Sequence, residues 1–178
     1  MPVDNILLQE GVITRLLGGL ATTVHIGLIS VVLSIPLGIL VGLFMTSNNK
    51  VVRAILRVYL EIVRVMPQLV LLFVVFFGTS EWFDVNFDGI GASIVVFTFW
   101  GAAELGDLVR GALESIPASQ YDSAFVLGLS RQQTFFKVIL PQAFKRLLPP
   151  AINLITRMIK TTSLCHLIGV VVLLRVGS

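Results

Sequence analysis

Charged residues are scarce in this chain: Asp, Glu, Lys and Arg make up 13% of its 178 residues, against about 25% in an ordinary soluble domain. Hydrophobic residues make up 56%, and the mean hydropathy is +0.94. The composition therefore predicts an integral membrane protein in contact with lipid. The formal charge of +3 would suit nucleic acid, but the basic residues lie at the ends of apolar runs, where they meet lipid headgroups, so we expect no nucleic-acid binding.

Motifs for catalysis and metal binding are also missing from the sequence. Glycine followed directly by lysine, which a phosphate-binding loop requires, never occurs, so ATP and Mg²⁺ would belong to a partner subunit. No Ser-His-Asp set, His-Glu-x-x-His or Gly-x-Ser-x-Gly occurs either, and we predict that the chain is not an enzyme. The spacing of His25 and His166 fits no metal site, and the single Cys165 excludes an internal disulfide. We therefore expect no metal or cofactor in this chain.

Four segments with few charges are predicted to cross or partly cross the membrane, within a single domain covering residues 1–178. A helix of about 20 residues crosses the roughly 30 Å hydrocarbon core. By this measure the predicted spans are 20–45, 60–79, 89–113 and 147–174. The acidic residues near the N-terminus argue against a cleavable signal peptide there.

Two features of the first predicted span concern packing. Pro36 is expected to kink the helix. Gly38 and Gly42 form a stripe of small residues where another helix can approach closely. We favour packing inside the chain over a dimer contact for this stripe.

The distribution of lysine and arginine predicts the orientation. Basic residues gather at 50–57 and within 114–146, whereas the loop at 80–88 contains only acidic charges. Because basic loops stay on the cytoplasmic side, both basic regions are predicted to be cytoplasmic. The N-terminus and the 80–88 loop are then outside.

The polar segment 117–143 carries local signals for two short helices. Pro117 should stop the preceding helix, and Ser119 can cap a new one with Asp122 three positions later. Gly128 suits the left-handed residue that ends this helix. Ser130 with Gln133 repeats the cap pattern and should open a second helix that runs to Pro141. Further on, the pair Pro149-Pro150 predicts a bend before the fourth span.

The same segment resembles the cytoplasmic signature loop of permease subunits of binding-protein-dependent ABC importers. That signature is Glu-Ala-Ala, three residues, Gly, nine residues, Ile, one residue and Leu-Pro. Here Asp122-Ser123-Ala124 fills the first triplet, and Gly128, Val138 and Leu140-Pro141 follow at the required spacing. The alternative is an ordinary loop that packs on its own bundle, but seven positions at fixed spacing favour the signature.

Other stretches narrow the resemblance to the polar amino acid branch of these permeases. They are Glu61–Pro67, Val109–Pro117, Leu140–Ala143 and Lys160–Leu164, and the likeness extends over about residues 14–170. The chain departs from the branch at Asp122-Ser123, where Glu-Ala is usual, at Val65-Met66, where Gly-Thr is usual, and at Thr161, where Asp is common. It also stops at Ser178, before the family's last span, which suggests a truncated C-terminus.

The resemblance implies an all-α membrane protein of the type I ABC importer kind, with about four to five transmembrane helices and a cytoplasmic coupling loop. Such a permease is a multi-pass protein of a prokaryotic inner membrane. It works with a second permease subunit, two ABC ATPase subunits and an extracytoplasmic amino-acid-binding protein. The positions that would contact the ATPase are Tyr121, Asp122, Ser123, Ala124, Phe125, Gly128 and Leu129. Alternatives are a permease for an opine, a sulfur amino acid or an osmoprotectant, and a non-transporting scaffold or channel.

Charged residues near or inside the spans need partners. Arg57, Glu61 and Arg64 have the spacing of an ion-pair ladder on one helix, as do Asp107, Arg110 and Glu114. Arg157 and Lys160 interrupt an apolar run with no acid nearby on the same helix, so they should face a cavity, a partner helix or substrate. Lys160 could hold a substrate carboxylate together with the hydroxyls of 161–163, or snorkel outward. The predicted substrate-path residues are Glu61, Arg64, Arg157, Lys160, Thr161, Thr162 and Ser163.

Overall fold

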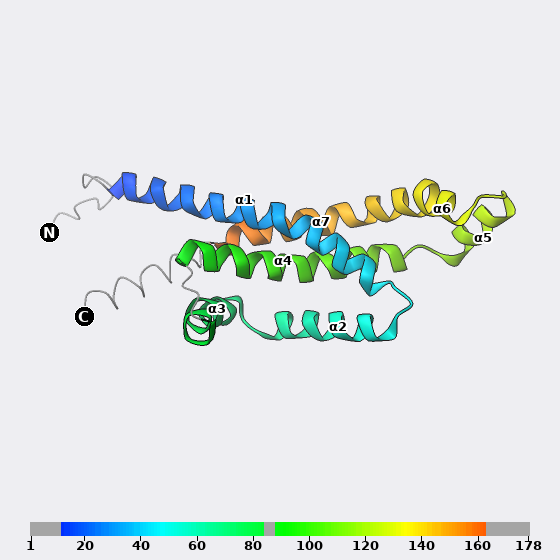
Figure 1. Cartoon of the computed structure of the whole chain (residues 1–178). Coiled ribbons are helices and arrows are strands. Elements are labelled where there is room, and N and C mark those ends of the chain that lie inside the picture. The colour runs from blue at the N-terminus through cyan, green and yellow to red at the C-terminus, as the bar shows by residue number, and fades with distance from the viewer. Residues whose placement is uncertain (1–11, 84–87, 163–178) are drawn as a thin grey trace.

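The computed structural model describes residues 12–83 and 88–162, and every regular element in these ranges is a helix (Figure 1). The expected all-α fold is confirmed. The helices are α1 (Val12–Met45), α2 (Lys50–Val65), α3 (Gln68–Phe83), α4 (Gly89–Glu114), α5 (Ala118–Val126), α6 (Arg131–Thr134), a π-helical turn η2 (Phe135–Ile139) and α7 (Leu140–Thr161).

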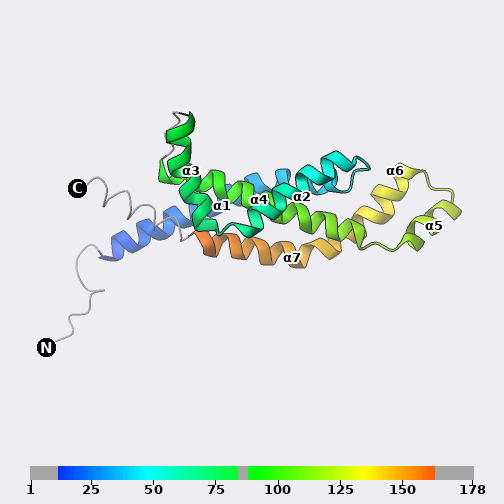
Figure 2. The ribbon, with the colours of Figure 1, turned by 90° about the horizontal axis from the view of Figure 1, so that it is seen from below.

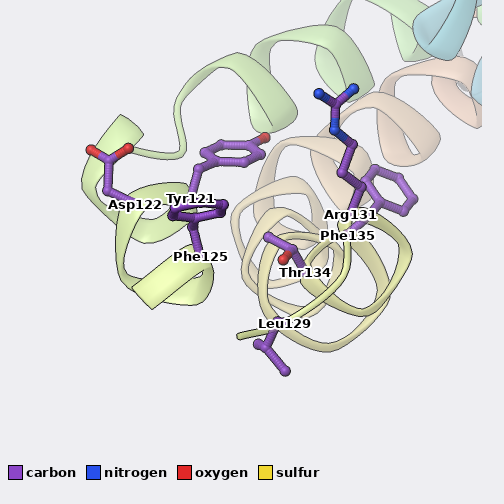
Figure 3. A pocket seen from close by; sticks show the side chains of 7 residues that line it. All are labelled: Tyr121, Asp122, Phe125, Leu129, Arg131, Thr134 and Phe135. Atoms are coloured by element: carbon purple, nitrogen blue, oxygen red, sulfur yellow. The ribbon is translucent and has the colours of Figure 1, made fainter. Parts of the chain in front are cut away.

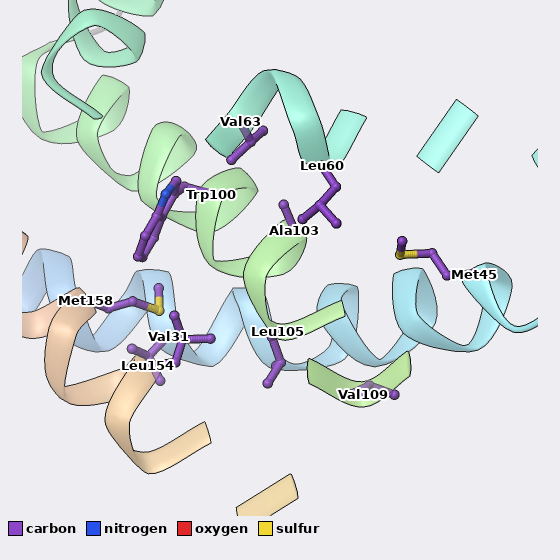
Figure 4. Packing of buried hydrophobic residues seen from close by; sticks show 10 residues of the cluster. All are labelled: Val31, Met45, Leu60, Val63, Trp100, Ala103, Leu105, Val109, Leu154 and Met158. Atoms are coloured by element: carbon purple, nitrogen blue, oxygen red, sulfur yellow. The ribbon is translucent and has the colours of Figure 1, made fainter. Parts of the chain in front are cut away.

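Helix α4 is the centre of the bundle, because it contacts α1, α2, α3 and α7. The main core gathers around it in Figure 4, with Trp100 and Leu105 on α4, Val31 on α1, Leu60 on α2 and Met158 on α7. Within the described residues, Gly18–Met45 and α4 are long and apolar enough to cross a membrane alone. Helices α2 and α3 reach that standard only as a bent pair.

The predicted internal packing of Gly38 and Gly42 is confirmed. A Cβ atom on Gly38 would lie 2.7 Å from the Cβ of Leu105, and one on Gly42 would lie 2.5 Å from the Cβ of Val109. On the facing helix, a Cβ atom on Gly106 would lie 2.5 Å from the Cγ1 of Val41. Helices α1 and α4 therefore approach so closely that their contact has no room for side chains at these glycines.

The segment 60–79, which was predicted to cross or partly cross the membrane, is divided between two helices. The first part of the segment is the end of α2, which stops at Val65. Helix α3 starts at Gln68, and the chain bends by 104° between the two helices (Figure 2). Met66 is extended, with φ −80° and ψ 125°. Pro67 explains the break, because a proline disfavours the helical conformation of the residue before it.

The prediction of a bend at Pro149-Pro150 is wrong. Helix α7 contains both prolines and runs unbroken from Leu140 to Thr161. A proline φ near −65° is compatible with a helix, and the lost hydrogen bonds concern the carbonyls of Lys145 and Arg146, both exposed residues. The end of the signature loop and the fourth predicted span are therefore one helix in the described range. Residues 163–174 of that span lie outside the described residues.

In the signature loop, some local predictions are confirmed and others are wrong. Gly128 has a φ of +72°, as predicted, and Ser130 forms the predicted capping box with Gln133. Ser119 does not cap α5, because the helix starts at Ala118 with Pro117 at its N-cap position. Pro141 does not end the second helix. The π turn η2 just before it widens the helix, which gives the proline ring room.

The two predicted basic regions lie at the same end of the molecule. Figure 1 shows the turn from α1 to α2 and the helices α5 and α6 at one end, and the start of α1 and helix α3 at the other. This arrangement is the one that the distribution of lysine and arginine requires.

Candidate functional site

Glu104 lies where α2, α4 and α7 meet and accepts hydrogen bonds from two arginines. Its Oε1 lies 3.0 Å from Nε of Arg64 on α2, and its Oε2 lies 2.6 Å from Nη2 of Arg157 on α7. Arg64 also pairs with Asp107, one turn along α4. The side chains of Glu104 and Asp107 are each only 15% exposed, so the bundle shields both carboxylates.

The cluster continues along α4 as the predicted ladder. Arg110 lies 2.6 Å from Asp107 and 2.6 Å from Glu114, so this ladder is confirmed. Asp107 thus joins the ladder to Arg64. In total three arginines pair with three carboxylates, and the ion-paired cluster carries no net formal charge.

Arg157 also stacks on an aromatic ring. Its guanidinium carbon lies 4.9 Å from the ring centroid of the buried Trp100, a cation–π geometry that stabilises a cation at a partly desolvated site. The Arg157 side chain is nevertheless 53% exposed. Its guanidinium group therefore remains accessible to another anion.

Not every predicted substrate-path residue belongs to this cluster. Among the described residues, Glu61 is exposed and forms no ion pair, so the predicted ladder through Arg57, Glu61 and Arg64 is wrong. Arg64 turns away from its own helix because Glu104 and Asp107 on α4 offer it two shielded carboxylates.

The threonine hydroxyls that follow Arg157 form hydrogen bonds to backbone carbonyls. The hydroxyl of Thr161 donates to the carbonyls of Arg157 and Met158. The buried Thr162 donates to its own helix and, at 3.3 Å, to the carbonyl of Thr23 on α1. The bond from Thr162 to Thr23 therefore joins α7 to α1, whereas the bonds of Thr161 stay within α7. Lys160 is exposed, and Ser163 lies outside the described residues.

Glu104 and Trp100 were not predicted from the sequence as site residues. Glu104 could have been identified from the sequence, because this residue directly follows the charge-free run Gly89–Ala103 inside a predicted span. An acid in such a position requires a partner or a function. No pattern distinguishes Trp100 from an ordinary core aromatic.

A second candidate site lies at the far end of the bundle, between α5 and α6. Residues of the signature loop line a cavity of about 480 Å³ (Figure 3). The lining residues are Tyr121, Asp122, Phe125, Leu129, Arg131, Thr134 and Phe135. Phe125 is 82% exposed, so this end presents an aromatic side chain with no cover from the described part of the chain.

Helix α5 is nevertheless attached to the bundle. Ala124 is buried, and the side chain of Gln120 lies 3.0 Å from that of Gln142 on α7. Next to it, Arg146 donates a hydrogen bond of 2.6 Å to the carbonyl of Ser115 at the end of α4. A force on α5 can therefore reach α7 directly. The predicted ATPase-contact residues Asp122, Ser123 and Gly128 are exposed.

Comparison with known proteins gives consistent results. Residues 34–177 match the family model described as binding-protein-dependent transport system inner membrane component. The L-cystine transport system permease protein TcyB of Bacillus subtilis is 31% identical over 169 residues, covering 95% of this chain and 72% of the relative. The glutamine transport system permease protein GlnP of Escherichia coli is 32% identical over 166 residues, covering 93% of this chain and 76% of the relative.

Solved structures with the same fold are also found. A crystal structure of an amino acid ABC transporter with histidines matches with a TM-score of 0.79 and 25% identity, over 86% of this chain and 71% of that one. An inward-facing structure of the MetNI methionine ABC transporter matches with a TM-score of 0.56 and 26% identity, over 86% of this chain and 70% of that one.

Proposed function

Because this chain belongs to the family of binding-protein-dependent transport system inner membrane components, we propose that it is the membrane-spanning permease subunit of an ATP-driven amino acid uptake system. It forms part of the translocation path in a prokaryotic inner membrane, with its N-terminus outside. The names of the relatives support amino acids as the transported class. The basic loops at one end of the bundle support the orientation.

The observation that carries this proposal is the bridge from Glu104 to Arg64 and Arg157. An amino acid zwitterion has one carboxylate and one ammonium group close together. The accessible guanidinium of Arg157 suits the carboxylate, and Glu104 with the face of Trp100 suits the ammonium. Lys160 lies one turn further along α7 and offers a second cation for the carboxylate.

The charge balance of the cluster favours a substrate without net charge. Three arginines and three carboxylates already compensate one another, and a zwitterion adds equal charges of both signs. Each substrate charge can then replace one half of an existing ion pair. This exchange limits the cost of leaving a carboxylate unpaired where the bundle shields it.

Energy and delivery would come from partner proteins. The sequence has no phosphate-binding loop, so ATP hydrolysis is assigned to two ABC ATPase subunits bound at the α5–α6 end. Tyr121, Phe125 and Leu129 are the apolar candidates for that contact, and Gly128 fixes the turn between the helices. A binding protein delivers the amino acid from outside, and a second permease subunit completes the path.

Two alternatives remain testable. The first is a permease for another small solute. A sulfur amino acid is one such solute, since cystine and methionine occur in the names of similar proteins. An opine or an osmoprotectant would also carry the charges that this cluster matches. The second alternative is a non-transporting scaffold or channel. Such a protein would not retain an ATPase through the signature loop, so co-purification of an ATPase distinguishes a transporter from it.

The experiment is reconstitution of the permease with its ATPase and binding protein in proteoliposomes. Amino acids are added one at a time, and ATP hydrolysis and uptake are measured. We expect one amino acid or a small group to stimulate both activities. Glu104→Gln should raise the half-saturating concentration while the ATPase stays bound. A complete complex that no amino acid stimulates would refute the proposed substrate class.

A further inference from the structure

Helix α2 has three faces that differ in chemistry. At about 100° per residue, Leu60 and Val63 fall on the face that is buried against the core. A second face carries five apolar residues that are between 52% and 77% exposed: Val51, Ile55, Val58, Ile62 and Val65. The third face is basic in its N-terminal half, where it carries Lys50, Arg53 and Arg57.

These three basic residues line a cavity. Together with Ala54 they line a cavity of about 280 Å³, and all four residues are exposed. Within the described residues none of the three cations forms an ion pair, although Glu61 follows Arg57 by one turn on the same face. The helix end itself is satisfied, because the side chain of Asn49 accepts hydrogen bonds from the backbone of Val51 and Val52. Any attraction for an anion at this cavity therefore comes from the side-chain charges and not from the helix end.

The position of this cavity fits the headgroup layer of a membrane. The apolar span of α1 ends at Met45, and Lys50 follows after a short turn. Figure 1 shows this turn at the same end of the molecule as α5 and α6. Lysine and arginine at such a depth extend toward the lipid phosphates while their aliphatic stems stay on apolar surface.

We propose that Lys50, Arg53 and Arg57 form a binding site for the phosphate of an anionic phospholipid whose acyl chains lie along the apolar face of α2. The small Ala54 lies between the basic residues and that face, which leaves a path from the phosphate to the chains. A soluble anion would use the cations but not the exposed Val51, Ile55 and Val58. A lipid uses both surfaces at once.

The test measures lipid binding to the assembled transporter by native mass spectrometry. Phosphatidylglycerol is titrated against phosphatidylcholine with the same acyl chains. We expect the anionic lipid to bind more tightly, and each of the substitutions Lys50→Gln, Arg53→Gln and Arg57→Gln to weaken that binding about fivefold, as expected for one basic residue near a membrane surface. The matched control is Lys137→Gln with Lys145→Gln, which removes two exposed charges at the same end outside the cavity and should change nothing.

Additional measurements distinguish a lipid site from a soluble-anion site, a diffuse charge effect and a protein contact. The charge-preserving variant Lys50→Arg, Arg53→Lys and Arg57→Lys should keep the lipid, which assigns a loss in the glutamine variants to the removed charge, provided that those variants still retain the ATPase. Displacement of the lipid by inorganic phosphate would overturn the proposal in favour of a soluble anion. An equal loss in the control variant would make the effect one of diffuse charge. Loss of the ATPase with lipid binding unchanged would assign the three residues to a protein contact.

Discussion

Glu104 on α4 and Arg157 on α7 form an ion pair of 2.6 Å, although 53 residues separate them in the sequence. The pair fixes α7 against the central helix at a point where Arg64 of α2 also reaches Glu104. A substrate that binds here has to compete with this pair. The strength of the pair in the empty protein therefore bears directly on how a solute enters the site.

The first prediction concerns the strength of that pair. Glu104→Gln and Arg157→Gln should show a coupling free energy of about 0.5 to 1 kcal/mol, because Arg157 is half exposed and such pairs are weak. The measurement is a double-mutant cycle from thermal unfolding of the purified complex without substrate. Glu114→Gln combined with Arg157→Gln should be additive, since Glu114 pairs with Arg110. Additivity in the first cycle as well would show that the pair contributes nothing to stability.

The second prediction concerns the contact between α1 and α4. Gly42→Ala should destabilise the protein by about 1 to 3 kcal/mol, the usual cost of overpacking. The new Cβ would lie 2.5 Å from the Cβ of Val109 and 2.7 Å from the backbone oxygen of Gly106, which cannot easily move. Gly111→Ala is the control, because its Cβ meets nothing within 4 Å and the change should instead stabilise α4 by about 0.5 to 1 kcal/mol. Equal unfolding midpoints for the two variants would contradict the close packing of the two helices.

Sequence patterns predicted features that depend on neighbours along the chain. The capping box of Ser130 and Gln133 and the positive φ of Gly128 need only a few adjacent residues, and both are confirmed. The close packing at Gly38 and Gly42 also followed from the sequence, since small residues on one face permit close approach. The helix that fills this space could not be predicted, because it depends on how the whole bundle packs.

Contacts between helices were the main source of error. Arg64 has Glu61 at a favourable spacing on its own helix, yet it pairs with Glu104 and Asp107, which packing brings close. Proline effects were similarly ambiguous. Pro67 breaks a helix, whereas Pro149 and Pro150 do not, because surrounding contacts decide whether a helix tolerates the lost hydrogen bonds.

The third prediction concerns orientation. Asp88→Cys and Gln132→Cys, each in a Cys165→Ala background, should react with an impermeant thiol reagent from opposite sides of the membrane. Both positions are exposed, and they lie in the acidic and the basic region respectively. Asp88 caps α4 through Gly91, so its loss should cost about 1 kcal/mol, too little to invert a span. Labelling of both cysteines in intact cells would disprove the proposed topology.

The fourth prediction concerns coupling to the ATPase. Gly128 has a φ of +72°, and a Cβ there would meet nothing within 4 Å, so a side chain is strained but not blocked by this chain. The strain amounts to about 1 to 2 kcal/mol for most residues and less for asparagine. Gly128→Val should therefore insert into the membrane normally but fail to retain the ATPase. Gly128→Asn should retain more of the ATPase than Gly128→Val.

The measurement is recovery of the ATPase with an affinity-tagged permease, together with substrate-stimulated hydrolysis. Gly111→Val is the matched control, because it adds the same side chain in open space on a helix without positive φ. If strain in the turn controls the contact, ATPase recovery should fall in the order glycine, asparagine and valine at position 128 and stay constant at 111. If the partner surface tolerates no side chain there, asparagine and valine should lose the ATPase equally. Full ATPase recovery and full transport in Gly128→Val would remove α5 from the coupling mechanism.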